Sequence, residues 1–166
     1  MLSKTTISLF NLYVSFSYLE KKICWQTLSL FLENHDLRNI VVAGDLNIVL
    51  EPKEKRGGNI GNIGKDPFQE TVDSLIHAHD LLDLKPKKGS FTWTNNRLGL
   101  AQISARLDRF LVQSSLLDFG IHLHQFCISS HHTIILLLFY WKEKKILAHY
   151  IFVSILFGMK GMVLGN

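Results

Sequence analysis

The segment from Asn39 to Leu50, NIVVAGDLNIVL, constrains the fold of this chain more than any other stretch. Its run of β-branched and aliphatic residues predicts a buried strand. Asp45 and Asn47 lie two residues apart, and on extended backbone such side chains point to the same side, so a carboxylate and an amide can converge on one small ligand. Gly44 would let that ligand approach the backbone. The segment predicts a site, although GDLN suits a strand-closing turn equally well.

A strand and a helix are expected before this segment. Residues 5–14 alternate and are rich in aliphatic and aromatic side chains, which predicts a strand. Residues 19–34 carry apolar side chains at helical intervals, which predicts a helix with a wide buried face. Its apolar positions form two sets, namely Leu19, Ile23 and Leu30, and Trp25, Leu28 and Leu32. Strand, helix and strand in this order predict a βαβ-like unit.

A loop and a second helix are expected after it. Residues 51–65 contain a proline, several charges and repeated glycines, a composition typical of a flexible surface loop. The helix that follows has clear start signals, because Asp66 can cap it, Pro67 suits its first turn and Gln69 stands where a capping box requires it. Its apolar stripe comprises Phe68, Val72, Leu75, Ile76 and His79.

Further strands are expected at residues 91–94, 105–112 and 133–141. Alternation over 105–112 places two sets of side chains on opposite faces. These sets are Leu107, Arg109 and Leu111, and Arg106, Asp108, Phe110 and Val112. A carboxylate in such a half-buried strand must find a partner, so Asp108 is expected to be paired.

The composition indicates one domain with a hydrophobic core, since 47% of the 166 residues are hydrophobic. The net charge of +4 suits a polyanionic partner.

The cysteines and the apolar segments bear on location. Cys24 and Cys127 lack metal-ligand spacing and are expected to be reduced, intracellular thiols. No secretory signal is expected at the N-terminus. The apolar runs on either side of residues 142–145 are shorter than the roughly 18 residues that span a bilayer, so no membrane segment is expected.

Five motifs follow one another along the chain: GDLN at 44–47, EKRGG at 54–58, FTWTNN at 91–96, RLDR at 106–109 and SSHHTI at 129–134. In this order and at these separations, over residues 5–139, the chain resembles the endonuclease/exonuclease/phosphatase superfamily. Within it, the chain is most similar to the endonuclease domain of plant LINE-type retrotransposons. The blocks of that family read G-D-[FL]-N, F-T-W-x-N, R-[IL]-D-R and S-D-H-x-P-I, and EKRGG matches a loop common in the retrotransposon branch.

The resemblance implies an α/β fold, an incomplete four-layer α/β sandwich of two mixed β-sheets flanked by helices, as in deoxyribonuclease I. Residues 1–141 would form a partial endonuclease/exonuclease/phosphatase domain. Residues 142–166 would be an apolar C-terminal extension outside the family match. The first family strand, with its asparagine, and the segment with a metal-binding glutamate have no match in the twelve residues before Tyr13, so a truncated domain is expected.

The resemblance also implies roles in phosphodiester hydrolysis, which needs a positioned water, a base and charge stabilisation on the phosphate. Asp45 would orient or deprotonate the water, and Asn47 would hold a phosphate oxygen. His131 would stabilise the developing charge, and Asp108 would fix its tautomer. Tyr13 would contact the phosphate.

The residues alone also permit structural roles. Tyr13 would then be a strand aromatic, Asp108 the partner of Arg106 or Arg109, and His131 an exposed loop residue. The last motif departs from the family, because Ser130 stands at the aspartate position and Thr133 at the proline. A register shifted by one residue would assign His132 in place of His131, and either register lacks the carboxylate.

The expected partner is DNA, bound weakly, with Arg56, Arg97 and Arg109 as candidate contacts. The expected cofactor is Mg²⁺, with Asp45 and Asn47 as candidate partial ligands of an incomplete site. The sequence therefore predicts a metal-dependent phosphodiesterase, a DNA endonuclease-like domain of retrotransposon origin with little or no activity. The alternative is a catalytically dead remnant that at most binds nucleic acid weakly. An intracellular location is expected, and a nuclear one is compatible with the resemblance.

Overall fold

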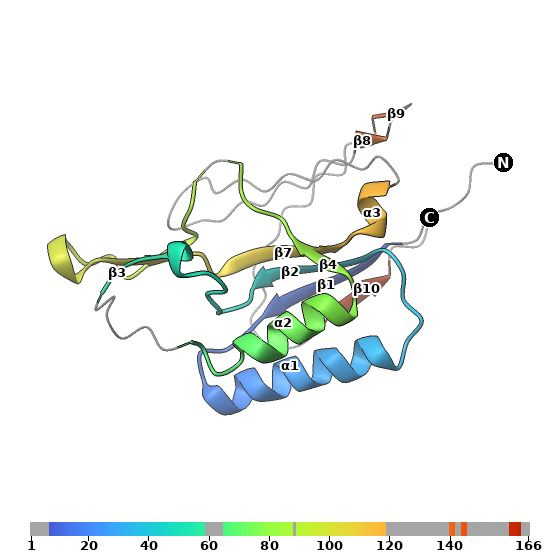
Figure 1. The fold of residues 1–166 in the computed structure, drawn as a ribbon, viewed down its shortest axis with the longest axis horizontal. Helices are drawn as coiled ribbons and strands as arrows, with labels where there is room; N and C mark the ends of the chain where they lie inside the picture. Colours follow the sequence, from blue (N-terminus) through green and yellow to red (C-terminus); the bar gives the residue numbers. More distant parts are fainter. Residues whose placement is uncertain are drawn as a thin grey trace.

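A computed structural model describes residues 7–58, 65–87, 89–118, 140–141, 144–145 and 160–163. These residues form a mixed α/β structure with a five-stranded mixed sheet and a three-stranded antiparallel sheet (Figure 1). The α/β class predicted from the sequence is confirmed at this level. The smaller sheet extends from one end of the larger one, and two helices lie along one face of the larger sheet (Figure 1).

The larger sheet has the strand order β10-β1-β2-β7-β4. Its strands are β1 (Ser8–Tyr13), β2 (Ile40–Asp45), β4 (Leu81–Asp83), β7 (Asp108–Gln113) and β10 (Lys160–Val163). The β1–β2 pair is parallel, and the other three pairs are antiparallel. The central strand β2 is buried along residues 40–43, as its apolar run predicts. The strand ends at Asp45, earlier than the sequence suggests.

Helices α1 (Tyr18–Glu33) and α2 (Gln69–Ala78) supply the main core on one face of this sheet. The helix over residues 19–34 is confirmed, but its wide buried face is wrong. One apolar set is buried, whereas Leu19, Ile23 and Leu30 are 63%, 54% and 59% exposed. A straight helix presents only one side to a sheet. The buried stripe comprises Lys21, Trp25, Leu28 and Leu32.

The entry to α2 differs from the predicted cap. The helix begins at Gln69, with Phe68 at the N-cap position and no side-chain cap, so the predicted cap by Asp66 is wrong. The Asp66 Oδ1 atom instead accepts a hydrogen bond from the Phe68 N–H at 2.9 Å, in the turn that leads into the helix. Gln69 does not complete a capping box. Its side-chain amide instead donates to the carbonyl of Leu50 at 2.9 Å and ties the helix to the segment after β2.

The smaller sheet has the order β3-β6-β5, formed by β3 (Lys55–Gly57), β6 (Ile103–Ala105) and β5 (Trp93–Thr94). The strand predicted over 105–112 is therefore divided between two sheets, with Arg106 and Leu107 between β6 and β7. The buried hydroxyl of Thr92 accepts hydrogen bonds from the N–H groups of Leu107 and Asp108 at 2.9 and 3.0 Å. This side-chain acceptor replaces a ladder partner and fixes the break.

Much of the loop predicted at 51–65 is ordered and partly internal. It contains the 3₁₀ turn η1 (Pro52–Glu54) and then β3, and Glu54 is only 5% exposed. The prediction of a surface position is wrong for Glu54, which buried arginines hold, whereas Pro52, Lys53, Arg56 and Gly58 are exposed as predicted. Residues 59–64 lie outside the described residues.

The opposite face of the larger sheet carries a second apolar cluster, which includes Leu116 of the short helix α3 (Ser115–Asp118). Near the C-terminus, β8 (Tyr140–Trp141) pairs with β9 (Lys144–Lys145) across the predicted domain boundary. β10 lies in the predicted extension but pairs with β1, so residues 160–163 belong to the sheet. In the part of the chain that the structure describes, no helix has the length and apolar character needed to cross a membrane.

Candidate functional site

Three of the predicted site residues form a row across the larger sheet. Tyr13, the last residue of β1, is paired in register with Asp45, the last residue of β2. Asp45 is in turn paired with Asp108, the first residue of β7. Residues paired in register lie side by side on one face of a sheet. The ladder therefore brings together three residues that are 32 and 63 positions apart in sequence.

The chain turns sharply where β2 ends. Asn47 adopts a left-handed conformation with φ of 45°, and its N–H donates to the Asp45 Oδ1 atom at 2.9 Å. The strand-closing turn that GDLN also allows is therefore the one found, and the extended backbone expected through Asn47 is wrong. Gly44, with φ of 126°, is required by the neighbouring strand, because a Cβ atom there would lie 2.0 Å from the carbonyl oxygen of Leu12. The close approach predicted for a ligand is made by β1.

Tyr13, Asp45 and Asn47 line one cavity of about 720 Å³. Asp66 and Gln69, at the entry to α2, add polar groups to its wall. The remaining lining residues are largely apolar and come from the loop between β1 and α1, the segment after β2, the smaller sheet and the link from β6 to β7. They include Phe16, Leu50, Pro52, Trp93, Ile103 and Leu107. A concave, mostly apolar cavity with a few convergent polar groups is typical of a ligand site.

Asp45 has the electrostatics of a functional carboxyl group. Burial, followed by the carboxylate of Asp108 across the ladder, raises the pKa of Asp45 to about 6. The hydrogen bond from the Asn47 N–H and the charge of Lys21 lower this pKa, but they do not outweigh burial. A carboxylate with a pKa near neutrality accepts a proton more readily than an exposed one, which suits a general base.

A buried ion network joins β7, which carries Asp108, to η1 and β4. Arg106 and Arg109 both contact Glu54 of η1 and Asp83 of β4, with distances of 2.5 to 2.8 Å between the paired nitrogen and oxygen atoms. Lys85 joins the same two acids from the surface at 2.8 and 2.9 Å. The alternation predicted for residues 105–112 is wrong here, because the break after β6 turns both arginines toward the same acids.

The structure corrects one of the predicted DNA contacts. Arg109 is 0% exposed and also donates to the carbonyl of Ile48, so it is a structural residue and does not reach a DNA surface. Arg56 in β3 and Arg97 in the β5–β6 loop are exposed, as a DNA contact requires.

The salt bridges of Arg106 and Arg109 are made with the carboxylates of Glu54 and Asp83. His131 lies outside the described residues.

The oxygen donors around the row do not fit a preformed magnesium site. Asp45 and Asn47 offer one carboxylate and one amide to the cavity, and Asp108 stands opposite Asp45. Within the described ranges, no group of three or more His, Cys, Asp and Glu side chains is placed to hold a metal ion. Mg²⁺ requires a near-octahedral set of oxygen ligands. The expectation of Mg²⁺ therefore stays a prediction from the resemblance.

Two residues with a direct effect on the site were not predicted. Lys21 is 6% exposed and contacts both the Asn47 carbonyl and Asp66. Its position could have been found, because residue 21 is in helical phase with the buried Trp25, Leu28 and Leu32. The role of Thr92 in fixing the start of β7 depends on pairing between distant segments, and no local pattern signals it.

The chain was compared with family models and with curated proteins. No family model matches it, and no curated protein matches it.

Proposed function

We propose that this chain is a phosphodiesterase-like domain, related to the metal-dependent DNA endonucleases of LINE-type retrotransposons, with little or no turnover of its own. The proposal includes the finer fold, an incomplete sandwich of the deoxyribonuclease I kind. It also includes DNA as the partner, through Arg56 and Arg97.

The observation that carries the proposal is the row Tyr13, Asp45 and Asp108, with Asn47 turned into the same cavity. The motifs that suggest the family were recognised from the sequence, and the pairing of the strands is independent of that recognition. Strand pairing brings Tyr13, Asp45 and Asp108 together at one end of the sheet, where Asn47 lines the same cavity as Tyr13 and Asp45. Their meeting supports a common chemical role.

The arrangement suits an attack of water on a phosphodiester. Asp45 accepts a hydrogen bond from the turn that bears Asn47, so its carboxylate is held in a fixed position. With its raised pKa, Asp45 can take a proton from a bound water. The Asn47 amide and the Tyr13 hydroxyl are uncharged donors for phosphate oxygens. His131 and Asp108 would complete the set by the roles that the resemblance gives them.

The second candidate is a catalytically dead remnant that at most binds nucleic acid weakly. The donor set favours it, because the row offers only the two aspartates Asp45 and Asp108, and no group of three or more His, Cys, Asp and Glu side chains is placed to hold a metal ion among the described residues. Ser130 also stands where the family has a further aspartate. These two observations are the reason that we expect low activity even if the first candidate is right.

Relaxation of a supercoiled plasmid in the presence of Mg²⁺ separates these candidates, with Asp45→Ala and the exposed Asp36→Ala as a matched pair. We expect at most slow nicking, lost in Asp45→Ala and kept in Asp36→Ala. Fast nicking that depends on Asp45 would overturn the expectation of low activity. Absence of nicking, with or without measurable DNA binding, would select the remnant, and fast nicking would overturn it.

A further inference from the structure

The side chain of Lys21 crosses from α1 to two segments that line the candidate cavity. Its ammonium group donates to the carbonyl oxygen of Asn47 at 2.7 Å and to the Asp66 Oδ2 atom at 2.6 Å. Asn47 lies 26 positions and Asp66 lies 45 positions along the chain from Lys21. One cation therefore joins the helix α1, the turn after β2 and the entry to α2.

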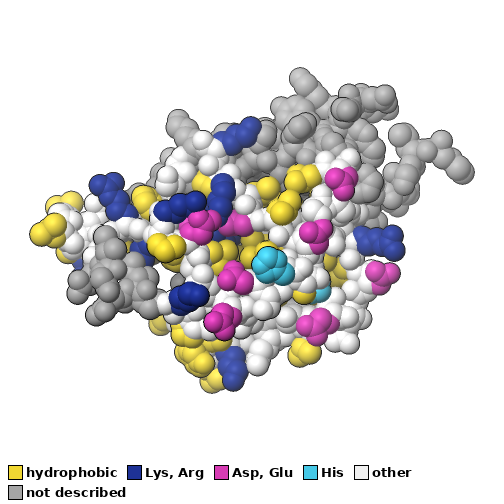
Figure 2. All heavy atoms as spheres, in the orientation of Figure 1, with side chains coloured by type: hydrophobic (Ala, Val, Ile, Leu, Met, Phe, Trp, Pro, Cys, Tyr) yellow, Lys and Arg dark blue, Asp and Glu magenta, His cyan; other side chains and the backbone are white. Residues whose placement is uncertain are grey.

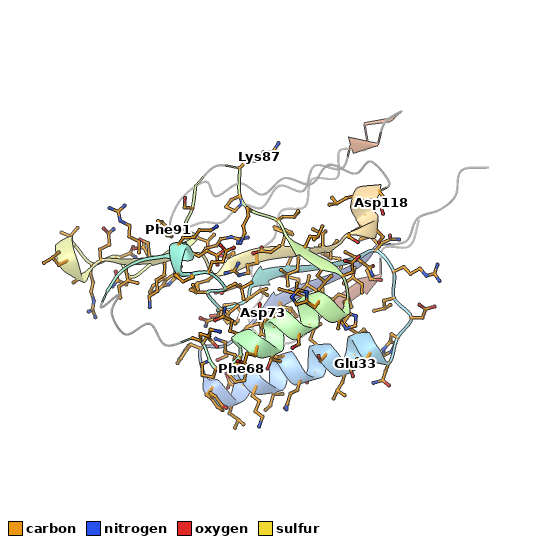
Figure 3. All side chains as sticks on the ribbon, in the orientation of Figure 1. Glu33, Phe68, Asp73, Lys87, Phe91 and Asp118 are labelled. Carbon is orange, nitrogen blue, oxygen red and sulfur yellow. The ribbon has the colours of Figure 1, made fainter. Side chains whose placement is uncertain are left out.

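The surroundings of Lys21 show that this contact is internal. The residue is 6% exposed and belongs to the buried stripe of α1. The Lys21 ammonium lies 5.8 Å from the ring centroid of Phe68, and the rings of Tyr18 and Phe68 are 4.9 Å apart. Figure 3 shows Phe68 where α2 begins, beside the N-terminal end of α1. A buried ammonium group is costly unless it is paired, so its partners are held firmly in place.

Both partners of Lys21 act on the geometry of the site. Lys21 binds the carbonyl oxygen of Asn47, and the N–H of the same residue donates to Asp45. The other partner, Asp66, uses its second carboxylate oxygen to hold the Phe68 N–H. Asn47 and Asp66 both line the cavity. An apolar side chain at position 21 would fill the same volume without either bond.

We propose that Lys21 is a positioning residue of the candidate site, which sets the Asn47 turn and the Asp66 wall of the cavity through its two hydrogen bonds. The proposal deepens the proposed function, since it concerns the same cavity. It does not depend on turnover, because the positions of Asn47 and Asp66 are measurable in the chain alone.

The test compares Lys21→Met, which keeps the volume, and Lys21→Arg, which keeps the charge, with Lys22→Met at the exposed neighbouring lysine. Hydrogen exchange of backbone amides is followed by NMR. In Lys21→Met we expect the Asn47 and Phe68 amides to exchange about tenfold to a hundredfold faster, as loss of charge-assisted hydrogen bonds implies. Lys21→Arg should recover most of this protection, and Lys22→Met should not change it. Equal protection in Lys21→Met and the wild type, or uniform loss over the whole sheet, would overturn the proposal.

Two further measurements cover the remaining outcomes. If Lys21→Met does not fold, the wild-type ammonium of Lys21 is observed directly. A protected signal with scalar coupling to the Asn47 carbonyl carbon supports the proposal, and a rapidly exchanging ammonium contradicts it.

A titration with dimethyl phosphate then tests the proposed function separately, by following the chemical shift of the Asn47 side-chain amide. A wild type that shows no shift with this probe would count against phosphate binding and would leave the Lys21 result standing.

Discussion

At the scale of single residues, Asp45 is held where its charge is unfavourable. It is partly buried, and the ladder places Asp108 directly opposite. A chain selected for stability alone would place a neutral residue there. Functional sites commonly retain such costs, since the same environment that destabilises a carboxylate makes it a better base.

Asp45→Asn should therefore stabilise the fold at neutral pH. Between its ordinary value of 3.8 and the folded value of about 6, the folded chain keeps a proton on Asp45 that the unfolded chain releases. This favourable contribution is complete below pH 3.8 and is lost as pH rises through about 6. At pH 7.5 we expect the substitution to raise the free energy of unfolding by roughly 1 to 3 kcal/mol.

Chemical denaturation at several pH values measures this effect. The gain in unfolding free energy from Asp45→Asn should vanish near pH 3.5, where the wild-type carboxyl group is largely protonated in both the folded and the unfolded chain. Asp36→Asn, at an exposed position, serves as the control and should change little at any pH. A wild type that is as stable as Asp45→Asn at pH 7.5 would show that Asp45 is not destabilised by its surroundings.

Gly44 and Gly99 form a second matched pair at this scale. Both have positive φ, 126° and 62°, but a Cβ atom at Gly44 meets the Leu12 carbonyl at 2.0 Å, whereas nothing lies within 4 Å at Gly99. Gly99→Ala should cost about 1 kcal/mol of backbone strain. Gly44→Ala adds a clash inside the β1–β2 ladder, so we expect a loss above about 3 kcal/mol. Equal losses in thermal unfolding would mean that β1 moves aside freely.

Sequence patterns could identify Asp45, Asn47 and Tyr13, since each belongs to a strand end with a recognisable motif. They could not separate Arg109 from Arg56 and Arg97, because burial of one arginine depends on Glu54 and an acid from another strand. The turn at Asn47 could also be predicted, since GDLN suits a strand-closing turn. Its left-handed backbone and its hydrogen bond to Asp45 could not, because hydrophobic pattern does not set them.

At the scale of elements, the ion network joins η1, β4 and β7. Burial alone would raise the pKa of Glu54, but hydrogen bonds from Arg109, Lys85 and Arg106 outweigh it and hold that pKa well below its usual range. The pKa of Asp83 is lowered in the same way, against the effect of burial, chiefly by Arg106. The network thus fixes β7, on which Asp108 stands, relative to the segment after β2.

Glu54→Gln should strongly destabilise the fold. It removes one charge and leaves Arg109 buried without its closest acid, a change that costs about 3 to 5 kcal/mol in buried pairs. Because the folded pKa of Glu54 lies below its ordinary value of 4.5, the contribution is complete above pH 4.5 and is lost as pH falls through the folded pKa. The difference in unfolding free energy between the wild type and Glu54→Gln should therefore shrink below pH 4.5.

Urea unfolding at pH 7 and at pH 3.5 gives this difference, with the exposed Glu33→Gln as control. Losses of equal size for the two substitutions at pH 7 would show that the network contributes no more than a surface charge.

The existence of the helices and of the central strand could be predicted, because the helices carry apolar residues at helical intervals and the strand is a continuous apolar run. The division of residues 105–112 between two sheets could not. It depends on the hydroxyl of Thr92, the residue before β5, which accepts hydrogen bonds from the N–H groups at the break. The buried side of α1 could be predicted only in part, since two apolar sets compete for one contact surface.

At the scale of the whole molecule, the charge is modest and mixed. The net charge is +4, and Figure 2 shows basic and acidic side chains interspersed on the face it presents. Such a surface gives a weak field, so non-specific binding to DNA should be weak and sensitive to salt. Two exposed arginines would contribute. Arg56 lies in β3, next to Lys55 of the cavity lining, and Arg97 lies in the β5–β6 loop of the same sheet.

Substitution of these arginines should then weaken DNA binding more than substitution of an arginine elsewhere. If Arg56 and Arg97 each contact a phosphate, Arg56→Ala and Arg97→Ala should each reduce the slope of log affinity against log salt by about 1. Arg38 is equally exposed but lies before β2, at the end opposite Asp45, so Arg38→Ala should leave the slope unchanged. Fluorescence anisotropy with a labelled duplex at several salt concentrations measures all three. Equal slopes for the three variants would place the DNA contact elsewhere on the molecule, and a slope reduced by Arg38→Ala alone would move it to the far end of β2.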